Sequence, residues 1–202
     1  MRRTKEDAEK TRQTVLEAAL KLFSRDGYSL TTLSRIAKEA GCSRGPIYWH
    51  FNNKDELFEE VLSFSQQPLA NLIDRARGEL AHPLSAIHEF AEQWLRLLVE
   101  NRWHRQSFEI LLNKTELTAT MERTLKRERK LTRDVVSVLT NLVEQAQRRA
   151  LISRRHGADE LGLLCYTYLM GITQTWLFSP RLFKLEQEIP FFLDRLDRLL
   201  KD

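Results

Sequence analysis

The stretch that most constrains this chain is residues 31–51, TTLSRIAKEAGCSRGPIYWHF. Thr32 is a favourable N-cap residue, and apolar side chains then recur at helical spacing as far as Ala40. Gly41 should end this helix, because glycine readily takes the positive φ of a helix C-terminus. Ser43 offers a second N-cap only two residues later. Two short helices joined by a tight glycine turn predict a helix-turn-helix, whose second helix normally enters the DNA major groove.

The alternative interpretation of this stretch is an ordinary αα-hairpin. The second helix is short, yet it carries Arg44, Tyr48, Trp49 and His50, and Lys54 follows at the start of the next helix. That is more aromatic and hydrogen-bond-donating surface than a structural hairpin needs. The composition of this helix therefore favours DNA binding.

The distribution of charge supports the same interpretation. The chain of 202 residues carries a formal net charge of +4. Residues 1–50 hold ten Lys and Arg against six Asp and Glu, whereas the remaining 152 residues hold 22 of each. The whole excess lies on the segment with the motif, as expected for a surface that faces phosphates. A basic tail that aids solubility explains the charge less well, because cations are spread through the predicted helices at Lys21, Arg25, Arg35, Lys38 and Arg44.

Residues 11–62 resemble the DNA-binding domain of the TetR family of bacterial transcriptional regulators. Within that family the segment is most similar to multidrug-efflux repressors of the AcrR type, in which Arg-Gly likewise opens the recognition helix. Pro46 departs from the family pattern, which commonly has a small residue there; proline is tolerated in a first helical turn, where N–H groups are unpaired. The residues that carry the resemblance are Ala18, Ala19, Leu22, Phe23, Gly27, Thr32, Ile36, Ala37, Ala40, Gly41, the string Ile47-Tyr48-Trp49-His50-Phe51, Asn53, Lys54, Leu57 and Phe58.

The predicted DNA contacts follow from the motif and from the resemblance. Arg44, at the start of the recognition helix, is the candidate for reading a base edge. Helix N-termini and hydroxyl, imidazole and ammonium groups are candidates for phosphate. The full set is Thr32, Ser43, Arg44, Gly45, Pro46, Tyr48, Trp49, His50 and Lys54.

Helical periodicity continues to the end of the chain, which predicts an all-α fold of about nine helices. We expect a three-helix helix-turn-helix domain over residues 1–55 and a larger helical effector-binding and dimerisation domain over residues 56–202. The first helix should run from about Lys10 to Arg25, and Asn53 with Glu56 should form a variant of the capping box. The later helices are expected to span Asn53 to about Arg77, Leu84–Asn101, Trp103–Asn113, Leu117–Arg149, Ala158–Phe178 and Glu188–Lys201.

Aromatic side chains cluster in the second half of the chain. Aromatic residues at helical spacing mostly belong to a core. As a set they also resemble the lining of the apolar cavity that the TetR family uses for effectors, in which a few polar groups fix the ligand. Glu109 would suit a cationic ligand, although a surface salt bridge explains it as well. The candidate ligand-binding residues are Phe90, Gln93, Trp94, Trp103, Phe108, Glu109, Asn113 and Tyr166.

The last two predicted helices hold more apolar surface than one shell of a small domain can easily hide. An internal core is one explanation. The resemblance implies instead a four-helix dimer interface with twofold symmetry, built from two helices of each subunit. The candidate interface residues are Leu161, Leu164, Leu169, Phe192, Leu196 and Leu200.

The sequence offers no support for catalysis or for a bound cofactor. It has no nucleophile elbow, glycine-rich phosphate loop or HExxH motif. Cys42 and Cys165 lie far apart and show no metal spacing, so we expect thiols in a reducing cytosol and no metal site. No signal peptide or membrane span is evident, so we expect a bacterial cytoplasmic, nucleoid-associated protein that contacts no membrane.

These features favour a dimeric transcriptional regulator, and in particular a repressor. Its expected partners are double-stranded operator DNA with an inverted repeat, a second copy of the chain and a small apolar effector, cationic if Glu109 contacts it, that releases it from DNA. An efflux system is the expected target. The alternatives are a TetR-like activator or nucleoid-associated protein without an effector, and a helical ligand-binding protein that does not bind DNA.

Overall fold

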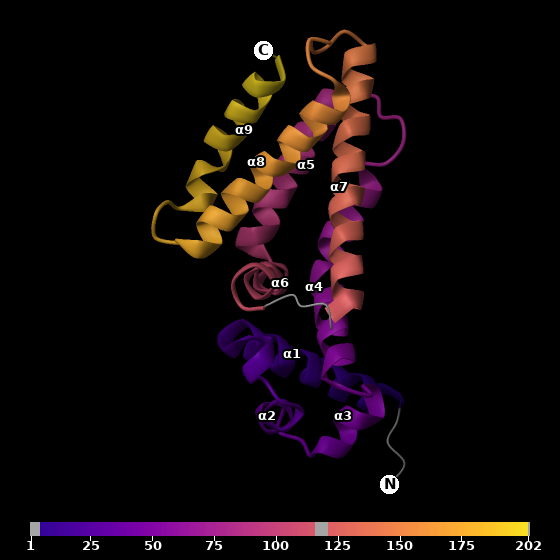
Figure 1. Ribbon diagram of the computed structural model, residues 1–202, viewed down its shortest axis with the longest axis vertical. Coiled ribbons are helices and arrows are strands. Elements are labelled where there is room, and N and C mark those ends of the chain that lie inside the picture. Colours follow the sequence, from indigo (N-terminus) through magenta and orange to yellow (C-terminus); the bar gives the residue numbers. More distant parts are fainter. Residues whose placement is uncertain (1–4, 116–120, 202) are drawn as a thin grey trace. The chain divides into compact units, whose positions relative to one another are not determined.

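The computed structural model describes residues 5–115 and 121–201, and every regular element within them is a helix (Figure 1). The all-α prediction is therefore confirmed for this part of the chain. The helices are α1 (Lys5–Leu30), α2 (Leu33–Glu39), α3 (Arg44–His50), α4 (Lys54–Arg75), α5 (Pro83–Glu100), α6 (Arg102–Asn113), α7 (Glu122–Arg148), α8 (Ala158–Phe178) and α9 (Leu185–Lys201).

The predicted helix ends differ from the observed ones by a few residues in most cases. The bounds of α8 were predicted correctly. Helix α1 begins five residues earlier than expected, and α9 begins at Leu185 instead of Glu188, so that Pro190 lies inside it. The predicted start of α7 at Leu117 lies outside the described residues.

Gly27 interrupts α1 two residues after the end that was predicted for this helix. Its φ of 81° and ψ of 169° break the helix, and one further turn then continues to Leu30. The hydroxyl of Thr31 donates to the Gly27 carbonyl oxygen at 2.7 Å, which closes this turn. A β-carbon on Gly27 would lie 2.7 Å from the carbonyl oxygen of Lys114. Glycine is needed here both for its backbone angle and for the close approach of the residue that follows α6.

The turn between α2 and α3 confirms the predicted caps of the first motif helix. The Thr32 side chain accepts a hydrogen bond from the Arg35 amide, which satisfies a free N–H of the first turn. Gly41 has a φ of 66°. The Cys42 amide donates to Ala37 and the Gly41 amide to Lys38, which is the hydrogen-bond pattern of a Schellman C-cap.

Ser43 occupies the N-cap position of α3, but its side chain makes no capping hydrogen bond. This corrects the prediction that Ser43 caps the helix as Thr32 does. An N-cap side chain bonds to the amide of the second or third helical residue, and here the third is Pro46, which has no N–H. Helix α3 nevertheless begins at Arg44, so Pro46 does not displace its start.

The start of α4 shows a variant of the predicted capping box. Asn53 Oδ1 accepts from the Glu56 amide at 2.8 Å, as expected. The Glu56 carboxylate reaches back past Asn53 and accepts from the main-chain and side-chain nitrogens of Asn52, each at 2.7 Å. The capping box therefore extends to Asn52, one residue before the predicted N-cap Asn53.

Contacts divide the chain into two compact units, and α4, α6 and α7 each contribute to both of them. The first unit comprises residues 1–67 and 106–125, and the second comprises residues 68–105 and 126–202. The division within α4 falls at Pro68, a proline inside the helix. The functional boundary expected between residues 55 and 56 stays a prediction.

The first unit is built around a three-helix core. Helices α1, α2 and α3 pack on one another in pairs, and α4 adds Phe58. The Phe58 ring meets Phe23 edge-on at 5.0 Å and Tyr28 at 4.8 Å between ring centroids. The α6 segment of this unit joins α1 through Ser24, which donates to Glu109 at 3.1 Å. The fully buried side chains include Val15, Leu16, Phe23, Ile36, Ile47, Leu57, Phe58 and Leu62.

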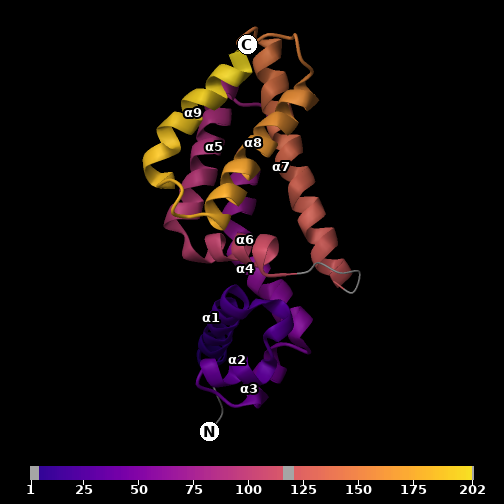
Figure 2. The same cartoon turned by 60° about the vertical axis from the view of Figure 1, so that its left-hand side comes forward.

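The second unit is a helical bundle in which α5 packs against both α8 and α9 (Figure 2). The Trp94 indole of α5 donates to the Thr173 hydroxyl of α8 at 2.9 Å inside this core. Helix α8 also lies against α7, since a β-carbon on Gly162 would be 2.7 Å from the Thr140 amide nitrogen. That separation is too small for any side chain, so Gly162 permits the close packing of these two helices.

Candidate nucleic-acid interface

Helix α3 is buried on one side only. Ile47 is fully buried and anchors the helix to the core of the first unit. The side chains of Tyr48 and Trp49 are 54% and 73% exposed, and Arg44 is also exposed. Large aromatic side chains are seldom left in water without a function, so this face has the surface expected of a recognition helix.

The other predicted contacts lie around the exposed face of α3. Thr32 is exposed at the start of α2, and Ser43 and Gly45 are exposed at the start of α3. Pro46 and His50 are half-buried. The His50 ring stands edge-on to Trp49 with 4.5 Å between centroids, so the exposed indole is supported from one side.

Several cations of this unit are paired with carboxylates of the same unit. Lys21 pairs with Glu39, and Asp26 binds both Arg25 at 2.7 Å and Arg35 at 2.5 Å. The hydrogen bond from Arg25 lowers the pKa of Asp26, and the hydrogen bond from Lys21 lowers the pKa of Glu39. Both carboxylates therefore stay ionised at neutral pH and offset two of these three positive charges.

Arg44 and Lys38 differ from the paired cations. Both are exposed, and within the described part of the chain neither side chain makes a hydrogen bond or ion pair. Their charges are therefore available to an anionic partner. From the sequence, Lys21, Arg25, Arg35, Lys38 and Arg44 were expected to act alike. In the structure Lys38 and Arg44 are available to a partner, whereas Lys21, Arg25 and Arg35 are engaged in ion pairs.

Lys54 occupies a different environment from the one expected of a phosphate contact. Its Nζ atom donates to the carbonyl oxygens of Tyr28 at 3.0 Å and Thr31 at 3.1 Å, and it lies 3.9 Å from the centre of the Tyr28 ring. Partial burial lowers its pKa. The ammonium group thus joins the first residue of α4 to the segment between α1 and α2. Direct phosphate contact by Lys54 stays a prediction, and the observed contacts favour a bracing role.

The structure brings together only part of the predicted effector site. Phe90, Trp94 and Tyr166 gather in the second unit, with centroid distances of 6.3 Å from Phe90 to Trp94 and 6.4 Å from Trp94 to Tyr166. Trp103 is half-buried in the same unit. Phe108, Glu109 and Asn113 fall in the first unit, where the Glu109 carboxylate binds Ser24.

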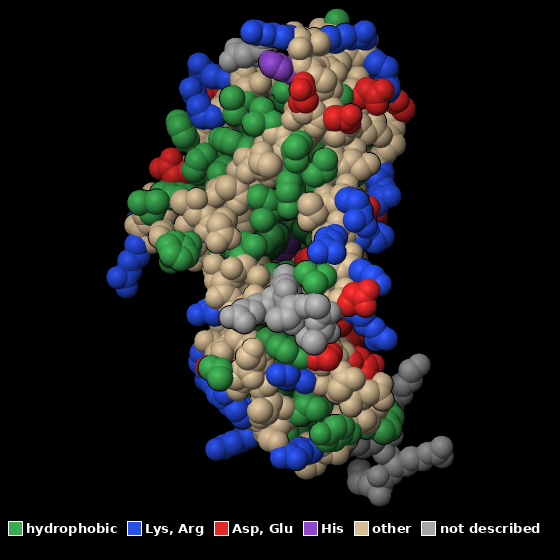
Figure 3. Space-filling model, viewed as in Figure 1, with side chains coloured by type: hydrophobic (Ala, Val, Ile, Leu, Met, Phe, Trp, Pro, Cys, Tyr) green, Lys and Arg blue, Asp and Glu red, His purple; other side chains and the backbone are tan. Residues whose placement is uncertain are grey.

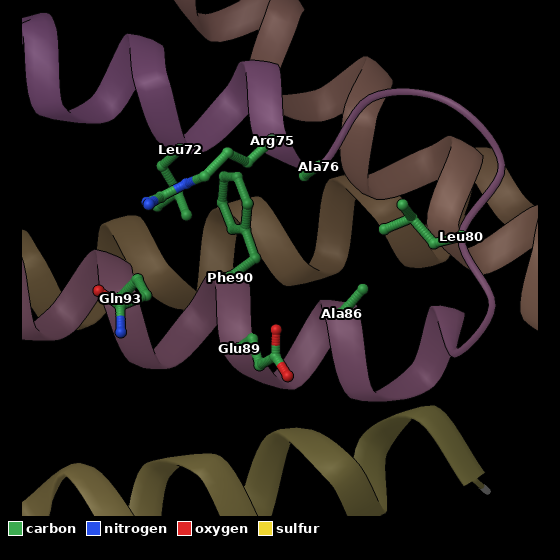
Figure 4. Close-up of a pocket in the computed structure, with 8 residues that line it drawn as sticks. All are labelled: Leu72, Arg75, Ala76, Leu80, Ala86, Glu89, Phe90 and Gln93. Carbon is green, nitrogen blue, oxygen red and sulfur yellow. The ribbon is translucent and has the colours of Figure 1, made fainter.

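A groove with a volume of about 350 Å³ lies in the second unit (Figure 4). It includes Phe90 and Gln93 from the predicted set. Sequence reasoning missed its other residues, because nothing in the local pattern indicates that the end of α4 and the start of α5 enclose a space. The groove is lined by Leu72, Arg75, Ala76, Leu80, Ala86, Glu89, Phe90 and Gln93.

A second hollow of about 580 Å³ lies in the first unit and is strongly acidic. Several of its carboxylates already have partners: Glu60 pairs with Arg12, Glu56 binds Asn52, and Glu59 accepts from Thr124. Within residues 5–115 and 121–201, no group of His, Cys, Asp and Glu side chains is arranged to hold a metal ion. No helix in the same residues is long and apolar enough to cross a membrane.

Four of the six predicted dimer residues lie inside their own chain. Leu196 and Leu200 are 1% and 2% exposed, and Leu161 and Leu169 are also buried. These four support the core of the second unit, so their assignment to an interface stays without structural support. Helix α8 is apolar on most sides, so periodicity could not indicate which of its leucines face inward. In α9, by contrast, Leu196 and Leu200 continue the helical spacing of the buried Ile189 and Leu193.

Other apolar residues of α8, α9 and their connection are exposed. Green side chains gather over α8 and α9 in Figure 3. Phe178 is 77% exposed. Of the predicted interface residues, Leu164 is exposed and Phe192 is half-buried. Several large apolar side chains exposed together on a single chain are typical of a surface that a partner covers. The exposed apolar residues are Leu163, Leu164, Phe178, Leu182, Phe191 and Leu199.

Comparison with known proteins decides what kind of protein has this architecture. Residues 15–61 match the family described as bacterial regulatory proteins, tetR family, and residues 82–201 match the MAATS-type transcriptional repressor, C-terminal region. The second match alone spans more than half of the chain. The chain belongs to the TetR family. Its members are transcriptional regulators and not enzymes, which confirms the regulator prediction.

Individual TetR-family relatives match over almost the whole chain. The HTH-type transcriptional regulator AcrR of Shigella flexneri is 33% identical, with 93% of this chain and 87% of that protein covered. The HTH-type transcriptional regulator TtgR of Pseudomonas putida is also 33% identical, with 89% and 86% covered. The structure is similar to that of NalD, the secondary repressor of the MexAB-OprM multidrug efflux pump in Pseudomonas aeruginosa, with a TM-score of 0.85, 28% identity and 98% of each chain covered.

Proposed function

We propose that this TetR-family chain is a dimeric repressor that binds operator DNA through α2 and α3 and controls an efflux system. The observation that carries the proposal is the exposed face of α3. Ile47 fixes this helix to the core, while Arg44, Tyr48 and Trp49 point away from it. The similarity to NalD, a repressor of an efflux pump, supports the regulatory target.

The residues on and around α3 fall into three proposed roles: reading a base, binding phosphate and allowing close backbone approach. Arg44 reads a guanine edge, because its guanidinium has no partner among the described residues and can bond in a bidentate manner. Thr32, Ser43, Tyr48 and His50 donate to phosphates, which fixes the register on the duplex. Gly45 and Pro46 allow the backbone to approach a base pair, and Trp49 lies against the sugar–phosphate backbone.

The exposed apolar surface of α8 and α9 supports a twofold dimer. Two copies present two recognition helices, so the operator should be an inverted repeat with half-sites on one face of the DNA. The residues that carry this surface are Leu163, Leu164, Phe178, Phe191 and Leu199, and not the buried leucines that the sequence suggested. We propose that the dimer acts on nucleoid DNA in the bacterial cytoplasm.

Release from DNA is proposed to follow binding of a small, largely apolar ligand in the second unit. The Phe90, Trp94 and Tyr166 cluster supplies the apolar surface. Such a ligand acts only if it binds the DNA-incompetent state more tightly, since equal affinity shifts no population. A coupling free energy of about 1–3 kcal/mol would be ordinary for an allosteric protein, and operator DNA must weaken ligand binding by the same factor.

Fluorescence anisotropy with the chain's own upstream DNA and with a scrambled duplex tests the DNA-binding part. Wild type should prefer the upstream DNA, and Arg44→Ala should lose roughly 1–3 kcal/mol of that preference. Arg129→Ala, an exposed residue of α7, is the matched control and should leave both affinities unchanged. Equal weakening on both duplexes would contradict the base-reading role of Arg44.

Transcription from the same upstream region separates the regulatory alternatives. A repressor lowers transcription, and an apolar compound from a broad panel restores it. Activation by the protein would favour the TetR-like activator, and lack of any responding compound would favour a regulator without an effector. If wild type prefers neither duplex, the chain is better explained as a ligand-binding protein that does not bind DNA.

A further inference from the structure

The groove between the end of α4 and the start of α5 shares Phe90 with the aromatic cluster, and its other residues lie outside that cluster. Arg75 and Leu72 reach it from α4, and Glu89, Phe90 and Gln93 reach it from α5 (Figure 4). Its volume of about 350 Å³ lies within the range of small-molecule sites. The groove lies wholly within the second unit.

The floor and one end of the groove are apolar. Phe90 is buried, and its ring occupies the middle of the floor in Figure 4. Leu72 and Ala76 are buried beside it. Leu80 and Ala86 form the apolar end. This surface suits the flat or cyclic body of an organic molecule.

The loop that carries Leu80 into the groove is held in place from inside the unit. The fully buried Gln145 side chain accepts from the Leu80 amide at 2.8 Å and donates to the Gly78 carbonyl at 2.7 Å. It also donates to Asn141 Oδ1 at 2.9 Å, which orients the amide. Gly78 has a φ of 86°, so the loop adopts a backbone turn that favours glycine. The groove is therefore preformed, which lowers the entropic cost of binding.

Three polar side chains around the groove are not engaged elsewhere in the described part of the chain. Arg75, Glu89 and Gln93 lie at the solvent-facing side of the groove, and within residues 5–115 and 121–201 their side chains make no hydrogen bond or ion pair. Neighbouring arginines differ: Arg77 binds Asp74 at 3.2 Å, and Arg96 binds Glu92 at 2.8 Å. One cation and one anion thus face the same apolar groove without neutralising partners.

We infer that this groove binds a small amphipathic zwitterion. Its carboxylate pairs with Arg75 and its ammonium group pairs with Glu89. Its cyclic body packs against the half-buried Leu80 and Ala86 at the apolar end, with Gln93 as a further hydrogen-bonding group. A ligand with a single charge gains one of these pairs and is repelled by the other charged residue. The inference names an effector class for the proposed repressor, and it rests on that proposed function only for its regulatory consequence.

Isothermal titration calorimetry on the full chain without DNA tests the inference directly. Four probes share one scaffold: naphthylalanine as the zwitterion, its methyl ester as the cation, its N-acetyl derivative as the anion, and the N-acetyl amide as the neutral form. The zwitterion should bind about fivefold more tightly than either singly charged probe, the scale of an exposed ion pair. Absence of this preference would overturn the inference.

Variants assign the preference to the groove. Glu89→Gln should raise the affinity of the anionic probe to that of the zwitterion, and Arg75→Gln should do the same for the cationic probe. Arg77→Gln, whose guanidinium is paired elsewhere, should keep the wild-type order. Ala86→Phe should fill the apolar end and abolish binding, with an unchanged melting temperature as the check on folding. If both Arg75→Gln and Glu89→Gln keep the wild-type order of probe affinities, the probe binds elsewhere and the groove is not its site.

Operator binding without ligand, measured on the same proteins, keeps the two proposals distinguishable. If wild type prefers its operator but shows no preference for the zwitterion, the groove inference is overturned and the repressor proposal stands. Wild type with the predicted probe preferences but no operator preference overturns the repressor proposal and leaves the groove as a ligand site.

Discussion

The Nζ atom of Lys54 lies 3.1 Å from the carbonyl oxygen of Thr31, the residue that precedes the N-cap of α2. Thr31 is fully buried, so its carbonyl has little access to water. The ammonium group therefore satisfies main-chain acceptors of the α1–α2 connection and holds the start of α4 against the helix-turn-helix. A residue expected to bind phosphate from sequence alone is thus engaged within its own unit.

Replacing Lys54 by Met should lower the melting temperature, because the buried Thr31 carbonyl oxygen loses its ammonium donor and the Tyr28 carbonyl oxygen keeps only the Thr31 amide, while the aliphatic stem remains. The slope of log affinity against log salt should stay unchanged. A lysine that contacts phosphate would reduce the magnitude of that slope by roughly one. Lys38→Met, at an exposed site without a partner in the described part of the chain, is the control for stability. A slope reduced by one in Lys54→Met would restore the phosphate contact.

Gly45→Ala should separate folding from DNA binding. The φ of Gly45 lies outside the left-handed region, and an added β-carbon would meet only the Ser43 hydroxyl oxygen at an ordinary 3.9 Å. Alanine should therefore stabilise α3 by about 0.5–1 kcal/mol. Operator affinity should fall roughly tenfold, about 1.4 kcal/mol, if the backbone must approach the DNA closely. Thermal unfolding and anisotropy measure the two effects. Unchanged operator affinity would rule out that close approach. Gly41→Ala, at a φ of 66°, should instead destabilise the unit.

Leu163→Arg should produce a folded monomer that has lost operator affinity. Leu163 is half exposed on α8, so arginine can point into water in the single chain. Leu196→Arg is the contrasting variant, and it should lose helical content because position 196 is buried. Light scattering and circular dichroism distinguish the two outcomes. A Leu163→Arg protein that stays dimeric would exclude this face from the interface.

Gly162→Ala should destabilise the second unit by about 1–3 kcal/mol through overpacking. The new methyl group would lie 2.7 Å from the Thr140 amide nitrogen and 2.8 Å from its Cα atom, and backbone atoms cannot move aside cheaply. Gly171→Ala provides a matched control on the same helix, since no side chain or other helix of the described chain lies within 4 Å of its added β-carbon. Urea denaturation of both variants gives the comparison; equal midpoints would contradict the packing argument.

Burial raises the pKa of the Cys165 thiol from 9.0 to about 12. The unfolded chain releases this proton near pH 9 and the folded chain does not, so the stabilisation is complete below pH 9 and declines as pH rises toward 12. At pH 10 the loss should be roughly 1.4 kcal/mol relative to pH 7. Cys165→Ala should lack this component when unfolding midpoints are compared at the two pH values. Identical pH dependence in the two proteins would show that the thiol is not protected.

The helix-turn-helix could be predicted from sequence because its signals are local. The Thr32 cap, the Gly41 turn and the apolar spacing of α2 act between residues that are close along the chain. The same holds for the bounds of α8. The family resemblance added the expected function, which the motif by itself left open between a regulator and an ordinary hairpin.

Only the tertiary structure decided which side chains are available for function. Lys54 and Arg44 were both predicted from the sequence to contact DNA. In the structure Lys54 binds carbonyl oxygens 23 and 26 residues earlier in the chain, whereas the Arg44 side chain has no partner among the described residues. Leu196 and Leu163 are equally apolar, but one is buried by its own unit and the other is not. Whether a side chain is free to bind DNA or a second subunit depends on its contacts with segments that are distant along the chain. A local sequence pattern does not specify those contacts.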